Sequence, residues 1–213
     1  MTNDAAVWHR IAALLPPEDA QAVVDCWSIG EQEGGLELLV SALLRHEVSI
    51  DETTRAEIAV VCEAWGMWPH PLAPRLFQCP GNGTASVLRL IEDTASAPLP
   101  ATTVGLGDQL VLVPWIRCTA CGQTLARTHT LEPWGMSLTP EHYVILDTDT
   151  DTDTDTDTDT DTDTDTGAIR HLITQGHGWD ALTALRASCG KPELAQPVIA
   201  GSSGQSGGFG EAG

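Results

Sequence analysis

A run of ten consecutive Asp-Thr pairs, from Asp147 to Thr166, places the strongest limit on how this chain can fold. In an extended conformation all ten carboxylates would point to one side and repel one another, and the run holds no apolar side chain to bury. We therefore expect residues 147–166 to be disordered. Any core must be built from the segments on either side of this repeat.

The negative charge of the chain is unevenly distributed. The formal net charge is −20 over 213 residues, and the repeat alone supplies ten of the carboxylates. Residues 1–69 hold 12 acidic and 3 basic side chains. This balance argues against nucleic acid and against an anionic membrane surface as partners, since both require clustered Lys and Arg. The partner that such a charge attracts is a basic protein.

Neither a secretory signal nor a membrane span is visible in the sequence. The first twenty residues include Asp4, Arg10 and Glu18 and have no apolar run after a basic start. The richest apolar stretch, Leu36–Leu44, is too short to cross a bilayer. We expect a cytoplasmic protein whose six cysteines stay reduced.

Residues 4–66 show the pattern of four short amphipathic helices. Pro16-Pro17 and Gly30 separate the first three, and Pro17 can be the first residue of the second. Asp51 is a good N-cap for the fourth helix, and Gly66 ends it. The apolar stripes of such helices can be buried only against one another, so the pattern predicts a four-helix bundle over residues 1–66. The stripes contain Val7, Trp8, Ile11, Leu14 and Leu15; Ala20, Val23, Val24 and Trp27; Leu36, Leu39, Val40, Leu43 and Leu44; and Ile58, Val61, Cys62 and Trp65.

Two adjacent glycines, Gly34 and Gly35, stand just before the third stripe. Each glycine costs about 1 kcal/mol relative to alanine in the interior of a helix. Either the helix begins after them, or another group approaches the backbone closely at this point. We expect the helix to begin after them.

The segment that follows has a different character. Residues 67–75 form a connector rich in Trp and Pro, in which regular helix is not expected. The apolar run Leu110–Val113 predicts a buried strand that can continue past Pro114. Gln123–His129 and Tyr143–Leu146 are typical of further strands, whereas residues 85–92 are ambiguous between helix and strand.

Beyond the repeat, Ala168–Thr174 and Trp179–Ser188 are interpreted as two short helices that pack back on these strands. The predicted fold class is therefore mainly α. It consists of an N-terminal four-helix bundle and a small mixed α+β domain, interrupted by the disordered repeat. That second domain would be formed by residues 76–146 and 168–190, and residues 191–213 would be a flexible tail.

Part of the helical segment carries a recognisable order of features. Gly30-Glu31 precedes a Leu-rich acidic helix that ends at Leu44, then come Val48-Ser49-Ile50 and a helix that ends at Trp65-Gly66. This order resembles the MafI-type immunity proteins of bacterial polymorphic toxin systems, over residues 20–66 only. The resemblance implies a helical protein that binds and neutralises a cognate toxin, often a basic nuclease. The family is typically a single small domain, whereas this chain continues to residue 213.

A toxin-binding surface would use the acidic side chains of the same segment. Carboxylates on the third helix and its flanks could steer a basic partner and raise the rate of association. Glu33, Glu37 and Ser41 would share one face if that helix reaches back far enough. The alternative is an ordinary solvated helix surface. The candidate contact residues are Glu31, Glu33, Glu37, Glu47, Asp51 and Glu52.

The segment Cys118-Thr119-Ala120-Cys121-Gly122 has the spacing of one zinc knuckle, in which a turn directs two thiolates to one tetrahedral ion. A structural site needs two more ligands, and no second C-x-x-C is present. The alternative is a pair of thiols on a turn beside a buried strand. A redox motif is less favoured, because the residues after Cys121 resemble a strand rather than a helix. The further ligand candidates are Cys79 and His129, with His142 and Cys189 in reserve.

No catalytic signature is visible, so we expect the protein not to be an enzyme. The first hypothesis is an immunity-like protein that neutralises a toxin through its acidic helical surface. The alternative is a binding or regulatory module organised by a zinc knuckle, with the helical segment serving for oligomerisation.

Overall fold

The structure is a computed structural model, and it describes residues 4–92, 99–100, 109–133, 135–147, 168–173 and 177–189. The predicted disorder of the Asp-Thr repeat, apart from Asp147, lies outside these residues, and so does the predicted flexible tail. None of the helices in these ranges combines the length and the apolar character that crossing a bilayer requires.

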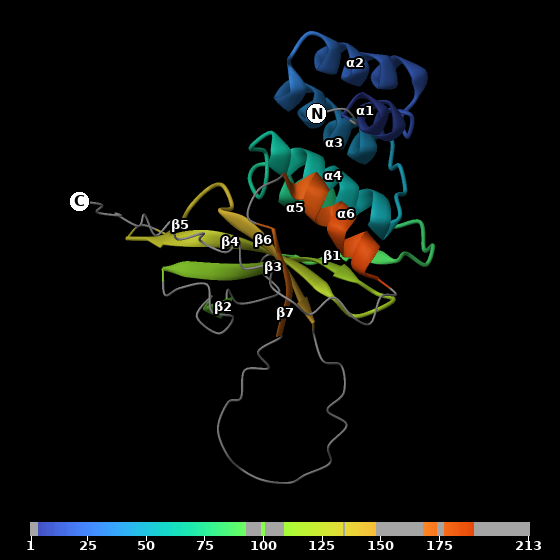
Figure 1. Ribbon diagram of the computed structural model, residues 1–213. Coiled ribbons are helices and arrows are strands. Elements are labelled where there is room, and N and C mark those ends of the chain that lie inside the picture. Colours follow the sequence, from blue (N-terminus) through green and yellow to red (C-terminus); the bar gives the residue numbers. More distant parts are fainter. Residues whose placement is uncertain are drawn as a thin grey trace, which may run out of the picture.

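Six helices lie in the described part of the chain, and Figure 1 shows them stacked on one side of a β-sheet. The helices α4 and α6 lie next to the sheet, and α1 and α2 lie farthest from it. The helices are α1 (Asp4–Ala12), α2 (Pro17–Ser28), α3 (Gln32–Arg45), α4 (Glu52–Ala64), α5 (Ala73–Gln78) and α6 (Gly178–Ser188).

Local signals in the sequence set several of the helix ends. Pro17 is the first residue of α2, where its fixed φ suits a helix and its missing N–H costs nothing. Asp51 caps α4, and its side chain accepts a hydrogen bond of 2.6 Å from the backbone N–H of Thr54. Gly66 follows α4 with φ +67°, a conformation that glycine adopts without strain. These three predictions are confirmed.

The beginning of α3 was predicted wrongly, because this helix already starts at Gln32 and contains both glycines. The alternative explanation holds for Gly35. A Cβ at that position would lie 3.0 Å from Cζ3 of Trp8 and 3.1 Å from Cβ of Cys26. The side chains of α1 and α2 therefore approach the backbone of α3 so closely that a larger residue would force them to shift.

The sheet contains seven strands, all paired antiparallel, in the order β1-β3-β4-β6-β7, with β2 also paired to β3 and β5 to β4. A bulge between Pro114 and Ile116 allows β3 to continue past the proline, as predicted. The strands are β1 (Leu88–Leu90), β2 (Leu99–Pro100), β3 (Leu110–Cys118), β4 (Thr124–Glu132), β5 (Gly135–Met136), β6 (His142–Asp147) and β7 (Ala168–Ile173).

The predicted strands at residues 110–116, 123–129 and 143–146 are confirmed, and the ambiguous segment 85–92 contains the short strand β1. The predicted helix at residues 168–174 is wrong, because Ala168–Ile173 forms β7 and pairs with β6. A short apolar run does not distinguish helix from strand by periodicity alone, and here the pairing with β6 decides. The predicted connector also ends earlier than expected, since α5 begins at Ala73 with Pro74 in its first turn.

The predicted mainly α class with a four-helix bundle is wrong, and the fold is a mixed α+β fold. The prediction assumed that the four helical stripes could be buried only against one another. In α4, however, every residue from Arg55 to Cys62 is buried, not a single stripe. The sheet and α6 cover the side of α4 that faces away from α3, while Trp65, assigned to the stripe, is 38% exposed.

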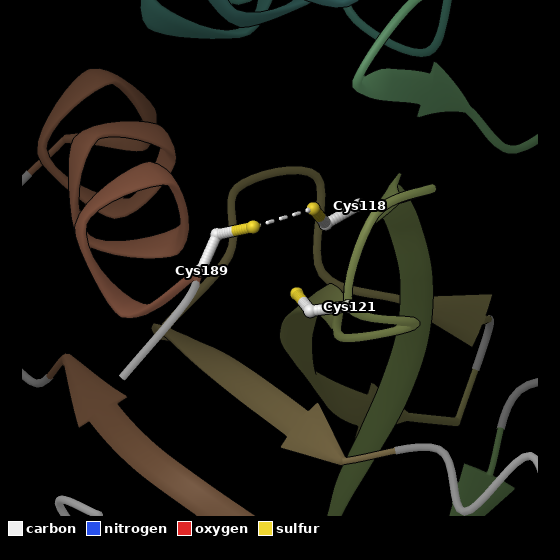
Figure 2. A group of neighbouring side chains, drawn as sticks. All are labelled: Cys118, Cys121 and Cys189. Atoms are coloured by element: carbon white, nitrogen blue, oxygen red, sulfur yellow. Dashed lines mark hydrogen bonds between the residues drawn. The ribbon is translucent and has the colours of Figure 1, made fainter. Parts of the chain in front are cut away.

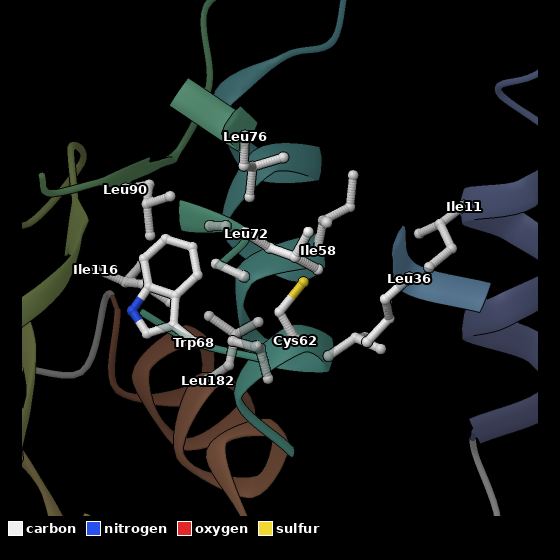
Figure 3. Packing of buried hydrophobic residues seen from close by; sticks show 14 of the residues in the cluster. Ile11, Leu36, Ile58, Cys62, Trp68, Leu72, Leu76, Leu90, Ile116 and Leu182 are labelled. Atoms are coloured by element: carbon white, nitrogen blue, oxygen red, sulfur yellow. The ribbon is translucent and has the colours of Figure 1, made fainter. Parts of the chain in front are cut away.

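A single hydrophobic cluster runs through the helices and onto the sheet. Figure 3 shows Ile11 and Leu36 on one side of α4 and Leu90 and Ile116, from β1 and β3, on the other. Leu182 of α6 packs into the same cluster. The predicted boundary at residue 66 therefore falls within one continuous core.

Two buried carboxylates of α4 connect the same layers. The carboxylate of Glu57, on α4, pairs with Arg10 of α1 and, at 2.7 Å, with Arg186 of α6. Glu63, near the end of α4, accepts a hydrogen bond of 2.7 Å from the hydroxyl of Tyr143 on β6. Both carboxylates thus fix α4 to elements far away in the sequence.

Candidate metal centre

Three cysteine side chains meet where α6 ends beside the hairpin between β3 and β4. The sulfur atoms of Cys118, Cys121 and Cys189 all lie within 4.8 Å of one another, and Figure 2 shows them directed toward a common point. The Cys118 and Cys189 sulfurs are 3.4 Å apart and joined by a hydrogen bond. This cluster could hold a metal ion.

The hairpin turn places two of the sulfurs. Cys118 is the last residue of β3, and its backbone N–H donates to the carbonyl oxygen of Gln123 at 2.8 Å. The N–H of Gly122 donates back to the Cys118 carbonyl oxygen at 2.9 Å, and Gly122 has φ +76°. This positive φ, which favours glycine, lets the chain reverse within four residues and leaves Cys121 beside Cys118.

The third sulfur arrives from the end of α6. Cys189 is the C-cap of that helix, and its N–H donates to the carbonyl oxygen of Leu185 at 3.2 Å. The neighbouring Ser188 hydroxyl donates to Oε1 of Gln123 at 2.7 Å, which holds the helix end against the hairpin. The amide of Gln123 in turn donates to Asp147 at 3.2 Å. Helix, hairpin and β6 are therefore joined directly beside the thiols.

The thiols influence each other's protonation. Burial raises the pKa of Cys118, but hydrogen bonds from the backbone N–H groups of Cys121 and Ala120 and from the neighbouring thiols outweigh it and lower this pKa below its ordinary value. Hydrogen bonds to Cys118 and Cys121, and to a smaller extent burial, raise the pKa of Cys189 to about 12. Cys118 is thus the thiol in this pair that ionises first.

The ligand set expected from the sequence is corrected by this geometry. Cys79 lies outside the cluster, at the C-cap of α5, where its thiol donates to the carbonyl oxygen of Arg75 at 3.8 Å. Burial raises the pKa of Cys79. Cys62 is a core residue as predicted, fully buried in α4.

His129 also lies outside the cluster. It pairs with Val111 on β3, seven positions from Cys118, which is about 23 Å along a strand. Its Nδ1 donates to the carbonyl oxygen of Ser137 at 2.8 Å. His142, held in reserve, pairs with Thr128 and is likewise outside the cluster.

Cys189 was expected only as a reserve ligand, behind Cys79 and His129, yet it is the third member of the cluster. It stands 68 positions after Cys121, beyond the Asp-Thr repeat, and no spacing motif links the two. Only the packing of α6 against the sheet brings them together. The available signal was weak: Cys189 directly follows a predicted helix that was expected to return to the strands.

The six predicted partner-binding carboxylates fall into two groups. Glu31, Glu33 and Glu47 are exposed on and beside α3. The other three have partners inside the protein. Glu37 pairs with Arg75, which also donates to Ser41, so Glu37 and Ser41 do share a face.

The two remaining carboxylates hold α4. Asp51 caps this helix through the N–H of Thr54, and Glu52 accepts a hydrogen bond of 3.0 Å from Nε of Arg55.

Comparisons with protein-family models, with curated proteins and with solved structures found no match for this chain.

Proposed function

We propose that the chain is a zinc-binding protein of the cytoplasm, in which Cys118, Cys121 and Cys189 hold one ion. The observation that carries this proposal is the convergence of three sulfurs within 4.8 Å from two distant segments. Thiolate ligands favour soft or borderline metals such as zinc over magnesium or calcium. A reducing compartment would keep the three thiols available as ligands.

The distances suit a tetrahedral site. Zinc–sulfur bonds of about 2.3 Å place two thiolates of a tetrahedron about 3.8 Å apart. The Cys118 and Cys189 sulfurs, 3.4 Å apart, need to move only a few tenths of an ångström to reach that separation. Three thiolates would leave the fourth position for a water molecule, and Cys121 lies on the exposed side of the cluster.

Such an ion would act on the fold. It would link the C-cap of α6 covalently to the hairpin of the sheet, and Arg186 on the same helix pairs with Glu57 of α4. Zinc would thereby stabilise the contact between the C-terminal helix, the sheet and the helical layer. Its role in this proposal is structural.

The test is the zinc content of the purified chain. We expect one equivalent by elemental analysis, lost in Cys118→Ser and in Cys189→Ser. Cys79→Ser is the matched control, because Cys79 lies outside the cluster, and it should retain the ion. A wild-type chain that binds no zinc, or loss of zinc in Cys79→Ser alone, would contradict the proposal.

A second proposal concerns the exposed side of α3. We propose that this surface binds a basic protein, such as the cognate toxin that the resemblance to immunity proteins implies. The specific support is an exposed apolar side chain in an acidic segment: Leu38 is 43% exposed, and Glu31 and Glu33 are exposed seven and five positions before it. Gly34, between them, has open space above its backbone. Exposed apolar and acidic side chains in one segment suit a partner with basic and apolar side chains.

This second proposal is tested with the toxin encoded directly upstream, where such a gene is present. Reversing the charge of Glu31 and Glu33 to Lys should slow association about tenfold at low salt and less at high salt. Glu141→Lys, an exposed carboxylate before β6, is the control and should change the rate little. An equal rate for the double variant and the wild type would exclude this surface.

A further inference from the structure

Two sulfurs of the cysteine cluster are in contact although their residues lie 71 positions apart in the sequence. Cys118 ends β3, and Cys189 follows α6 as its C-cap. The two sulfur atoms are 3.4 Å apart, and Figure 2 shows the Cys189 sulfur directed at that of Cys118. A disulfide has a sulfur–sulfur distance of about 2.05 Å, so the atoms need to approach each other by about 1.4 Å to form one.

The end of α6 allows this approach. Cys189 has φ −63° and ψ 119°, so its backbone has already left the helix. The hydrogen bond of 2.7 Å from Ser188 to Gln123 holds the helix end against the hairpin. A rotation of the Cys189 side chain can therefore bring the two sulfurs together without unwinding the helix.

The two sulfurs differ in their access to solvent. Cys118 is 2% exposed, whereas Cys189 is half-buried. A small oxidant from solution therefore reaches the Cys189 sulfur first, and Cys118 is the thiol that lies beside it. A solvent-accessible cysteine with a second thiol within reach is the arrangement of a redox-sensitive pair.

From this geometry we propose that Cys118 and Cys189 are a site of reversible oxidation by peroxides, which joins them in a disulfide and thereby regulates the metal centre. In what concerns zinc, this inference rests on the function proposed above. The disulfide would remove two of the three thiolate ligands, and Cys121 alone would not retain the ion. Disulfides in a reducing compartment are usually transient and redox-sensing, which suits such a role.

The reaction has two steps. The Cys189 sulfur attacks the peroxide, the O–O bond breaks, and a sulfenic acid and one water molecule form. The Cys118 sulfur then attacks the sulfenic sulfur: the S–S bond forms, the S–O bond breaks, and the hydroxyl leaves with the Cys118 proton as a second water. Two thiols are thus oxidised by two electrons while one peroxide is reduced to two waters. Two equivalents of a small thiol reverse the change by exchange and are themselves joined in a disulfide.

The probe for this proposal is hydrogen peroxide, added in small excess to the full chain as purified, with the remaining thiols alkylated after unfolding. Trypsin then separates the two cysteines, because it cleaves after Arg117, Arg127 and Arg186. We expect the peptide 118–127 joined to the peptide that begins at Ala187, with a mass two hydrogen atoms below the sum of both. A reductant should remove this cross-link.

Zinc is followed in the same samples with a colorimetric chelator. The wild type should release about one equivalent as the cross-link forms, and reduction should restore binding. A zinc-loaded chain that forms no cross-link would overturn this inference and leave the zinc site standing. A cross-link in a chain that holds no zinc would contradict the proposed function and support the oxidation site alone.

Cys121→Ser is the matched control, because Cys121 is the exposed member of the cluster and shares the peptide 118–127 with Cys118. At the end of the reaction this variant should be cross-linked to the same extent as the wild type, whereas Cys189→Ser should lose the cross-link. The proposal is overturned by a cross-link that Cys121→Ser abolishes, by an internal disulfide between Cys118 and Cys121 as the main product, or by oxidation without any cross-link.

Discussion

Gly35 is a residue at which the helices pack closely. A methyl group there would lie 3.0 Å from a ring carbon of Trp8, which is itself 1% exposed. The intrinsic gain of alanine over glycine in a helix, about 1 kcal/mol, works in the opposite direction. Overpacking typically costs about 1–3 kcal/mol, so the cost of the close contact should exceed the gain in helix propensity.

We therefore predict that Gly35→Ala lowers the free energy of unfolding by about 1 kcal/mol, measured by urea denaturation. Gly34→Ala is the matched control. An added Cβ at Gly34 meets no atom within 4 Å, so the free energy of unfolding of this variant should rise by about 0.5–1 kcal/mol. Equal effects of the two substitutions would show that the contact with Trp8 is not close.

Cys189 gives a second residue-scale prediction. Because its pKa is raised to about 12, the thiol is protonated near neutral pH and must lose its proton to bind an ion. The affinity for zinc should thus rise at least about tenfold per pH unit between pH 6 and 8, measured by competition with a chelator. An affinity that does not change with pH would mean that Cys189 is not a ligand.

At this scale the sequence predicted what depends on neighbours along the chain and missed what depends on neighbours in space. The cap at Asp51 and the proline at the start of α2 act within one turn, and both predictions are confirmed. The reason for Gly35 and the third thiol at Cys189 come from packing between distant segments. No local pattern contains that information.

Among the elements, α5 depends most on its surroundings. A helix of six residues is too short to be stable alone. Arg55 of α4, 4% exposed, donates to the carbonyl oxygens of Leu76 and, at 2.9 Å, Cys79 at the end of α5. A buried guanidinium thus donates to carbonyl groups at the C-terminal end of the short helix.

We predict that Arg55→Met destabilises the protein by about 2–4 kcal/mol, because two buried carbonyl groups lose a charged donor. Arg45→Met is the control: Arg45 is exposed and pairs with Asp19, and such surface pairs contribute about 0–1 kcal/mol. Thermal and urea unfolding of both variants measure the difference. A loss below about 1 kcal/mol for Arg55→Met would show that α5 is held by its apolar contacts instead.

The strands show where pattern reasoning is reliable and where it is not. β3 is a continuous apolar run and β6 a shorter one, and both were predicted. The six residues of β7 were interpreted as a helix, although they complete the sheet beside β6. For so short a segment the available hydrogen-bonding edge, not the propensity of the residues, determines the structure.

For the whole molecule, the prediction of the fold class was wrong for a single physical reason. Counting apolar stripes assigns each helix one buried face, whereas α4 is buried along its whole middle because it lies between α3 and the sheet. A sequence that is apolar on nearly all sides, as in Ala59-Val60-Val61-Cys62, is the sign of such a central helix. The sheet supplies the partner that the stripes alone did not reveal.

The continuity of the core leads to a prediction for unfolding. Helices and sheet share one hydrophobic cluster, so we expect a single cooperative transition in which helical circular dichroism and tryptophan fluorescence change together. The division into two domains at residue 66 predicts two separable transitions. Two transitions, or a fragment of residues 1–66 as stable as the whole chain, would contradict the account of one core.

X-ray absorption spectroscopy of the zinc-loaded chain tests the central claim, the three-thiol site, most directly. The account predicts three sulfur ligands at about 2.3 Å and one oxygen ligand at about 2.0 Å in the wild type, and no such shell in Cys189→Ser, which is expected to lose the ion. A shell with two or fewer sulfurs in the wild type, or one that Cys189→Ser does not alter, would contradict it.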